Sequence, residues 1–407
     1  MRQAWYLSRF TGLFRAWGQT PRRAHDPAVW VWAGTPANRP VSGPVDGVGG
    51  AGWTDEAAEL AAVGEAIERW QTHRLPGDVT RRARLPGASD ATPRDLASLI
   101  DPAAWVLFHA EQYAQPGFPF IPLAQGGELD WVKFRRVADG EPAWVPAELA
   151  FMDLRPGAVH RFTPAISTGW SAHRSVDRAV LRGVQEVIER DALMGGWWGT
   201  YPIEAHALEV SPALARPNLT YRAYRIASPY SDHVTMVTVE GDDREGTCFA
   251  IGSACRETRA ASLDKATLEA VQGRHYVRYL RSELAARGVT ELRVPRDFRE
   301  HAVAYSLDPA RLAATPLATA RPAGAPVGGD EPLAALVRRL GEARPPLFRL
   351  MTPPALAQHD LDWVVVRVMI PGLQPMHGDH ALPFLGGPCW GGRPLAAWAT
   401  IPPHPFA

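Results

Sequence analysis

Three stretches of this sequence repeat one charged pattern, and the repeat restricts the possible folds more than any other feature. The copies lie at residues 65–69 (EAIER), 186–191 (EVIERD) and 269–274 (EAVQGR). Residues three apart share one face of a helix, so each copy places two acceptor side chains side by side. The residues between them are apolar or small, which is typical of a face turned toward the interior. The repeat therefore predicts three helices with paired acceptor side chains beside buried apolar stripes.

Local signals extend these copies into whole elements. Capping residues and helical spacing predict three helices, over about residues 54–70, 175–193 and 262–280. Apolar runs predict three strands, at residues 234–239, 248–252 and 363–370. The near-continuous Val and Ile content of the last run favours a strand covered on both faces. Residues 315–332 are mostly Ala, Pro and Gly, which predicts a surface loop or spacer.

Composition narrows the functional classes. With 407 residues, 46% hydrophobic and 21% charged, the chain is expected to be globular. Lys plus Arg and Asp plus Glu number 43 each, so no overall field recruits nucleic acid or an anionic membrane. The three cysteines are scattered, which argues against a disulfide framework or a Cys-x-x-Cys zinc site and favours a reducing, cytoplasmic location. No apolar run reaches the roughly 18 residues of a membrane span, and residues 1–17 lack the marks of a signal peptide.

A surface pair of Glu and Arg, four residues apart, is the ordinary explanation for a single copy of the pattern. Three related copies favour a shared site. If the helices converge, up to five carboxylates lie together, and like charges raise one another's pKa values unless a cation is present. Magnesium with nucleotide phosphates fits this need, because Mg²⁺ prefers hard oxygen ligands and arginines bind phosphate in bidentate fashion.

Three further segments complete a known pattern. Residues 48–54 (VGGAGWT) read as a small-residue loop before the first copy, and residues 163–172 (TPAISTGWSA) as a turn before the second. Residues 368–373 (VMIPGL) read as a late strand with a Pro-Gly-Leu stop. Together with the three helices, these segments resemble the YcaO family of ATP-dependent amide-activating enzymes. The resemblance runs from about residue 40 to the C-terminus.

The resemblance implies an α+β fold with mixed β-sheets packed by helices and an internal pseudo-repeat. It divides the chain into an N-terminal segment, residues 1–40, and a YcaO-like catalytic domain, residues 41–407, without a ThiF-like leader-binding domain. The implied reaction takes place on a ribosomally made precursor peptide. A Cys, Ser or Thr side chain attacks a preceding backbone carbonyl, the carbonyl oxygen takes the γ-phosphate of ATP, and loss of phosphate leaves a thiazoline or oxazoline. Stand-alone members in bottromycin-type pathways make thiazolines or a macrocyclic amidine, and thioamidation is a related reaction.

The resemblance also suggests roles for particular residues. The expected Mg²⁺ ligands are Glu65, Glu68, Glu186 and Glu189. The expected ATP contacts are these four together with Arg69, Arg190, Glu269, Gln272 and Arg274, of which Arg274 is the expected phosphate contact. Many azoline-forming relatives end in a proline-rich tail that reaches the active site. By that likeness His404 and Pro405 are catalytic candidates, with His404 as a proton-transfer group, and an exposed tail is the alternative.

Some positions depart from the family pattern. Ala51 stands where many relatives carry Lys, Ala61 where they carry Ser, and Thr168 where they carry Asn. Either ATP is bound by substitute groups, or the chain is a non-catalytic paralogue that binds a peptide or scaffolds a partner. The expected partners are the precursor peptide and a separate leader-binding protein, with a homodimer as one form of assembly. Residues 377–380 (HGDH) offer two histidines for a metal, but without a third convincing ligand they predict a polar loop.

Overall fold

The computed structural model describes residues 13–36, 47–72, 80–84, 100–152, 161–243, 246–324, 328–351 and 363–406. Expectations for residues 1–12, for residues 37–46 at the proposed domain boundary and for residues 325–327 of the Ala-, Pro- and Gly-rich segment lie outside this part of the chain. Within it, the α+β fold class is confirmed, because several sheets are packed by helices.

The described strands form three sheets. The first has the order β1 (Phe14–Gln19), β2 (Trp30–Pro36) and β3 (Val48–Gly52). The second has the order β11 (Gly246–Ala254), β10 (Thr235–Asp243), β9 (Leu219–Ile226), β8 (Ile203–His206) and β12 (Arg321–Pro322). The third has the order β4 (Thr80–Arg84), β5 (Glu128–Arg136), β13 (Leu347–Leu350), β14 (Val364–Met369) and β7 (Trp170–His173), and β6 (Pro142–Pro146) also pairs with β5. All the pairings are antiparallel except that of β12 with β8.

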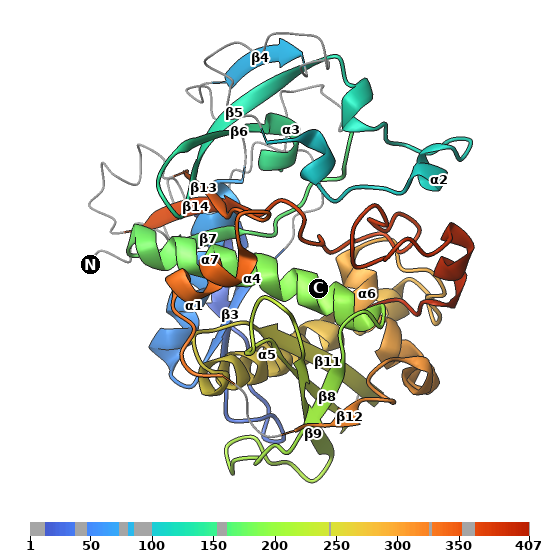
Figure 1. Cartoon of the computed structure of the whole chain (residues 1–407). Helices are drawn as coiled ribbons and strands as arrows, with labels where there is room; N and C mark the ends of the chain where they lie inside the picture. Colours follow the sequence, from blue (N-terminus) through green and yellow to red (C-terminus); the bar gives the residue numbers. More distant parts are fainter. Residues whose placement is uncertain are drawn as a thin grey trace.

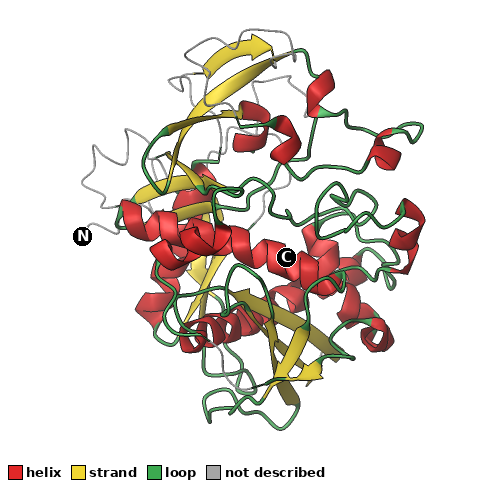
Figure 2. Cartoon of the chain, in the orientation of Figure 1, coloured by secondary structure: helices red, strands yellow, loops and turns green. Residues whose placement is uncertain are grey.

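Three long helices carry the repeated pattern: α1 (Asp55–Trp70), α4 (Val176–Trp197) and α5 (Arg259–Ala286). The shorter helices are α2 (Ala110–Tyr113), α3 (Ala147–Ala150), α6 (Phe298–Leu307) and α7 (Leu333–Leu340). No helix of the described residues is both long and apolar enough to cross a membrane. In Figure 1, α4 runs across the middle of the molecule, and it contacts β7 and β14 of one sheet and β9 and β11 of another. Figure 2 shows the long helices gathered between strand-rich parts above and below.

The predicted helices exist, and two of them are longer than expected. The first prediction is confirmed, with Thr54 capping α1. Helix α4 continues past the predicted end through Gly195 and Gly196, where a Cβ built on Gly195 would lie 2.3 Å from the Tyr201 ring. Close packing therefore overrides the low helix propensity of two glycines. Helix α5 begins at a Thr258 cap and ends at Ala286, just before Gly288 with its positive φ of 70°. Its last six residues, RSELAA, favour a helix.

The first helix packs unusually close to the strand before it. The small-residue segment at 48–52 is strand β3, so the expectation of a loop there was wrong. A Cβ on Gly50 would lie 2.3 Å from the Ala62 backbone nitrogen, and one on Gly52 would lie 2.6 Å from that of Ala58. Only glycine at these two strand positions allows this contact. Since β3 pairs with β2, the strands before residue 40 share a sheet with the strand that leads into α1.

Candidate functional site

Two of the acidic helices are anchored by the same kind of contact. Glu65 of α1 accepts a hydrogen bond from the Gly49 amide at 2.8 Å, and Glu186 of α4 accepts one from the Gly169 amide at 3.1 Å. Gly49 lies in β3, directly before α1, and Gly169 lies one residue before β7, which leads into α4. The two strand and helix units thus place the first glutamate of each pattern identically, as expected for a pseudo-repeat.

Gly169 is required by close backbone approach, whereas Gly49 lies against a side chain of α5. Gly169 has a positive φ of 89°, and a Cβ there would lie 2.1 Å from the Val368 carbonyl oxygen of β14. A Cβ on Gly49 would lie 2.9 Å from Nε2 of Gln272, which belongs to α5. The third helix therefore reaches the same glycine that anchors Glu65, and so joins α1 at the site.

The glutamates of α1 and α4 interact electrostatically. Burial raises the pKa of Glu68 well above its usual value, and the charges of Glu186 and Glu65 raise it further, whereas those of Arg69 and Arg190 lower it. Burial also raises the pKa of Glu186, against the opposing charge of Arg190. Such mutual effects need short distances, so the sequence pattern has brought these side chains together.

The second glutamate of α4 faces α5. Glu189 is 7% exposed, and it accepts hydrogen bonds from Ser253 Oγ at 2.6 Å and from the Cys255 amide at 3.0 Å. Burial raises its pKa, and the charge of Glu269 raises it further. Glu269 itself pairs with Lys265 at 3.1 Å. These contacts involve five glutamates of α1, α4 and α5, which are called the carboxylate group below: Glu65, Glu68, Glu186, Glu189 and Glu269.

Arg190 lies within reach of both halves of this group. Its charge lowers the pKa values of Glu68, Glu186 and Glu189, and its distance to Glu186 is 3.9 Å. Burial raises these pKa values most, and neighbouring carboxylates add to the shift for Glu68 and Glu189, so a bound cation would favour the ionised forms. Hard oxygen donors with excess negative charge fit Mg²⁺, so the residues present suit the expected metal.

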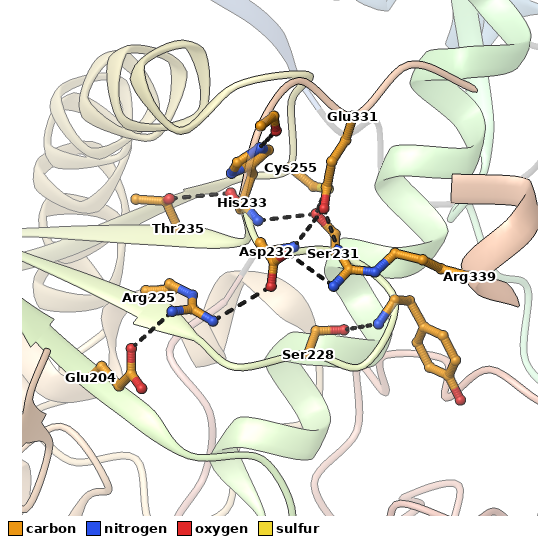
Figure 3. A network of polar contacts seen from close by, with 12 residues as sticks. Glu204, Arg225, Ser228, Ser231, Asp232, His233, Thr235, Cys255, Glu331 and Arg339 are labelled. Atoms are coloured by element: carbon orange, nitrogen blue, oxygen red, sulfur yellow. Dashed lines mark hydrogen bonds and ion pairs between the residues drawn. The ribbon is translucent and has the colours of Figure 1, made fainter. Parts of the chain in front are cut away.

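A network of polar contacts joins Cys255, Ser231 and Glu331 (Figure 3). The Cys255 thiol is 3.4 Å from Ser231 Oγ, and that hydroxyl donates a hydrogen bond to Glu331 at 2.5 Å. Arg339 of α7 pairs with Glu331. The network continues through Asp232, Arg225 and Glu204. Because the Cys255 amide donates a hydrogen bond to Glu189, this network is connected to a site carboxylate.

The structure adds Arg367 of β14, which the sequence interpretation missed. It is 3% exposed and donates to the carbonyl oxygens of Thr168 and, at 3.3 Å, Leu149. Burial lowers its pKa to about 10, while the charges of Glu186 and Glu68 oppose that shift. Arg367 therefore contributes positive charge next to the carboxylates. A single arginine inside an otherwise apolar strand was the signal that could have revealed it.

Asp191, the last residue of the second pattern, was given no role from sequence. It is 2% exposed and accepts hydrogen bonds from the Gln374 amide at 2.8 Å and from the Tyr201 hydroxyl at 3.1 Å. Burial raises its pKa to about 6. Its contacts hold the segment that follows the Pro-Gly turn against α4.

A cavity opens beside Arg367. Polar side chains of Glu148, Thr163, Thr168 and Gln374 line it together with apolar ones, among them Leu149. Glu148 is already engaged, since it accepts hydrogen bonds from the amides of residues 161 and 162. The mixture of an apolar wall and a few polar groups is typical of a ligand pocket.

The structure contradicts the expectation that Arg274 contacts a phosphate. Arg274 is 1% exposed, and its Nη1 donates to Asp26 at 2.6 Å. Arg278 binds the same carboxylate at 3.0 and 3.2 Å. These bonds hold the pKa of Asp26 far below its usual value despite its burial. Arg274 therefore joins α5 to the β1–β2 connection rather than facing the carboxylate group.

The tail, residues 401–406, is docked, so the alternative of an exposed tail is wrong. The Trp197 indole donates to the Pro402 carbonyl at 2.8 Å and the Tyr305 hydroxyl to that of Pro403 at 2.5 Å. His404 is 1% exposed and stacks on His301, with ring centroids 3.9 Å apart. Burial lowers the pKa of His404 well below its usual value, so its ring is neutral. Pro405 is buried beside it.

The tail does not share the position of the glutamates. Trp197, which holds it, follows Glu189 by eight residues, or about 12 Å along α4. Catalysis by His404 and Pro405 stays a prediction. Ala51 is 5% exposed within the core around β10, β11 and α5, so its small side chain fills a packed position.

The comparisons with known proteins agree with this architecture. A family model described as YcaO cyclodehydratase, ATP- and Mg²⁺-binding, matches residues 49–374. A heterocyclase solved in complex with substrate and cofactor has a TM-score of 0.71 and 17% identity, over 99% of this chain and 56% of that one. The YcaO protein of Methanopyrus kandleri, bound with AMPPCP and Mg²⁺, has a TM-score of 0.53 and 20% identity, over 88% and 86%. The E. coli microcin synthetase McbBCD complex gives a TM-score of 0.63 and 12% identity, over 96% of both chains.

A curated relative covers less of the chain. An uncharacterized protein of Methanothermobacter thermautotrophicus is 30% identical over 145 residues, which is 35% of this chain and 32% of that protein. The chain thus matches about a third of the length of this relative, and about half of the heterocyclase. The family model, in contrast, covers most of the chain and includes all three acidic helices. The chain therefore belongs to the YcaO family of ATP- and Mg²⁺-binding cyclodehydratases.

Proposed function

We propose that this chain uses ATP and Mg²⁺ to activate a backbone amide of a ribosomally made precursor peptide and to close a thiazoline or oxazoline ring. The observation that carries the proposal is that carboxylates of neighbouring helices raise one another's pKa values. The charges of Glu65 and Glu186 raise the pKa of Glu68, and that of Glu269 raises the pKa of Glu189, while Arg190 acts on Glu68, Glu186 and Glu189. Burying several carboxylates together costs free energy, because like charges repel. A bound cation with phosphates would offset that repulsion. Glutamates and arginines suit phosphoryl transfer, which requires positioning and charge neutralisation.

Each residue of the site has a proposed task. Mg²⁺ ligands are Glu65, Glu68, Glu186 and Glu189, and the other groups toward the phosphates are Arg69, Arg190, Glu269 and Gln272. When bound, Mg²⁺ neutralises phosphate charge and aligns the γ-phosphoryl group. The chain's own residues hold the geometry: the Gly49 and Gly169 amides orient two carboxylates, and Arg367 balances their charge.

The proposed reaction is, for the peptide, a dehydration. A Cys thiol or a Ser or Thr hydroxyl of the peptide forms a bond to the preceding carbonyl carbon and loses its proton. The carbonyl oxygen takes the γ-phosphoryl group, and ATP becomes ADP. The oxygen then departs with phosphate as the amide nitrogen loses its proton and the C=N bond forms. The peptide loses one water for each ring. The cavity beside Arg367 is the proposed place of the peptide, because it is partly apolar and Arg367, which interacts with Glu186 and Glu68, lines it.

The first test measures the binding of AMPPCP by calorimetry in Mg²⁺ and in EDTA. We expect Mg²⁺-dependent binding, and a loss of at least about tenfold in Glu189→Gln, because an amide is a poor ligand for this cation. Glu56→Gln is the matched control, since Glu56 is exposed in the first turn of α1. No nucleotide binding in the wild type would favour a non-catalytic scaffold protein instead.

The second test addresses the product. Short Cys- or Ser-containing peptides encoded near the gene are incubated with enzyme, ATP and Mg²⁺, with or without a co-encoded leader-binding protein. Phosphate release with loss of one water per ring supports azoline formation. Loss of water in a peptide whose Cys, Ser and Thr are replaced indicates a macrocyclic amidine, and exchange of oxygen for sulfur indicates thioamidation. Phosphate release that no peptide increases contradicts the proposal.

A further inference from the structure

We propose that His301, His377 and His380 form a site for one divalent transition-metal ion of the zinc class. The three rings come from two parts of the chain: His301 lies in α6, and the other two lie in the segment after the Pro371-Gly372 turn. One ring nitrogen from each lies within 4.8 Å of those of the others. Zinc–nitrogen bonds of about 2.0–2.1 Å in a tetrahedral site bring such nitrogens to roughly 3.4 Å, so small ring movements close the site.

The rings are buried and their ligand atoms have no other use. His301 is 0% exposed and His377 is 1% exposed. Across the described residues, Nε2 of His301, both nitrogens of His377 and Nδ1 of His380 lack hydrogen-bond partners. Buried polar atoms are normally paired, and an imidazole with neither nitrogen satisfied is an unusual exception. A metal ion supplies the missing partner for one nitrogen of each ring.

The opposite nitrogens are oriented as they are in known metal sites. Nδ1 of His301 lies 2.6 Å from the His404 carbonyl oxygen, so its proton is directed there and the lone pair of Nε2 is left for a metal. The His380 ring is hydrogen-bonded to the backbone of Ile401. Metal-binding histidines characteristically donate their second ring N–H to such a carbonyl, which fixes the tautomer.

His404 is not a fourth ligand. Its ring is stacked on that of His301 with an angle of 6° between the planes, and two parallel rings cannot direct their lone pairs to one ion. The fourth position is therefore open to water or another small ligand. The Trp398 indole packs beside two of the histidines. Its ring centroid lies 4.8 Å from that of His380 and 5.4 Å from that of His377.

Ligand chemistry separates this site from the carboxylate group. Three neutral imidazoles suit Zn²⁺, Co²⁺, Ni²⁺ or Cu²⁺ and are poor ligands for Mg²⁺, whereas the glutamates have the opposite preference. The proposed role of the ion is to hold the tail, because the backbone of Ile401 and His404 supports two of its ligands. The inference stands independently of the proposed amide activation.

The test uses the full chain purified without a histidine tag. The protein is stripped with a chelator, loaded with Zn²⁺ or Co²⁺, dialysed and analysed for metal by mass spectrometry. We expect one ion per chain, with visible absorption of the tetrahedral type for Co²⁺. His377→Ala and His301→Gln should each lower retention at least about tenfold, whereas His109→Gln, at a solvent-accessible helix start, should retain it.

Folding of the variants is checked by circular dichroism, and the wild type provides a measurement that needs no variant. Chelator competition gives its Zn²⁺ affinity, and limited proteolysis follows the tail with and without metal. We expect faster cleavage of residues near the tail in the metal-free protein. A folded wild type that retains no ion, or a folded His377→Ala protein that retains a full equivalent, overturns the proposal. Binding of Mg²⁺ and AMPPCP is measured in parallel, and its failure bears only on the proposed function.

Discussion

Replacing Asp26 by Ala should destabilise the whole fold while leaving the site glutamates of α1, α4 and α5 in place. Asp26 has a fully buried side chain, and two arginines of α5 bind it, Arg274 at 2.6 Å and Arg278 at 3.0 Å. Removing one partner of a buried ion pair leaves the other charge uncompensated, which typically costs about 3–5 kcal/mol. We expect a loss of this size in the free energy of unfolding, measured by urea denaturation with tryptophan fluorescence.

The pH dependence has a definite sign. The pKa of Asp26 in the folded protein lies far below its ordinary value of 3.8, so its contribution is complete at neutral pH and is lost as the pH falls below about 4. The difference between wild type and Asp26→Ala should therefore be constant from pH 6 to 8 and should shrink under acid conditions. The control is Glu291→Ala, which removes an exposed partner of Arg293 and should change stability by less than about 0.5 kcal/mol.

A small effect would refute this reasoning. If Asp26→Ala costs less than about 1 kcal/mol, as a surface pair would, the buried pair is not a structural link. If Arg274→Met weakens AMPPCP binding without lowering stability, Arg274 contacts the nucleotide after all.

Three further predictions concern the site. Glu68→Gln should stabilise the metal-free protein at pH 7.5, because it removes a carboxylate whose pKa burial raises, and it should weaken nucleotide binding. The gain in stability should shrink toward pH 5. A loss of stability in thermal melts would contradict this prediction. Gly169→Ala should lower the free energy of unfolding by at least about 2 kcal/mol, because φ is positive there and the new Cβ would meet the Val368 carbonyl oxygen. An unchanged midpoint in urea denaturation would disprove the strain. Asp191 has a pKa of about 6 against an ordinary 3.8. As the pH rises from 4 to 7, the free energy of unfolding of the wild type should therefore fall by up to about 3 kcal/mol relative to that of Asp191→Asn. Stability curves that stay parallel over this range would exclude the effect.

The acidic helices could be predicted because their signals are local. Capping residues such as Thr54 and Ser175 and the spacing of Glu and apolar residues fix a helix and its faces within a few turns. The family resemblance then indicated that the faces converge, and the mutual effects on the pKa values of Glu68 and Glu189 agree. Membership of the YcaO family and the fold class were confirmed in this way.

What could not be predicted depends on contacts between distant segments. Asp26 and Arg274 are separated by 248 residues. No local pattern indicates that the arginine of the third motif forms a buried ion pair with this aspartate. The histidines illustrate the same limit, because residues 377–380 lacked a third ligand in sequence until packing of α6 brought His301 beside them. Helix ends were missed where packing of Gly195 against Tyr201 outweighed propensity.

The two glycine amides that bind Glu65 and Glu186 also provide separate spectroscopic reporters of the site. Each amide proton points at a single carboxylate, one in each half of the pseudo-repeat. Nuclear magnetic resonance of the deuterated protein could follow the Gly49 and Gly169 signals during a Mg²⁺ titration, because the shift of a hydrogen-bonded amide responds to the charge of its acceptor. Signals that move together would describe a single cooperative binding event, and signals that move at different Mg²⁺ concentrations would reveal the order in which the halves fill.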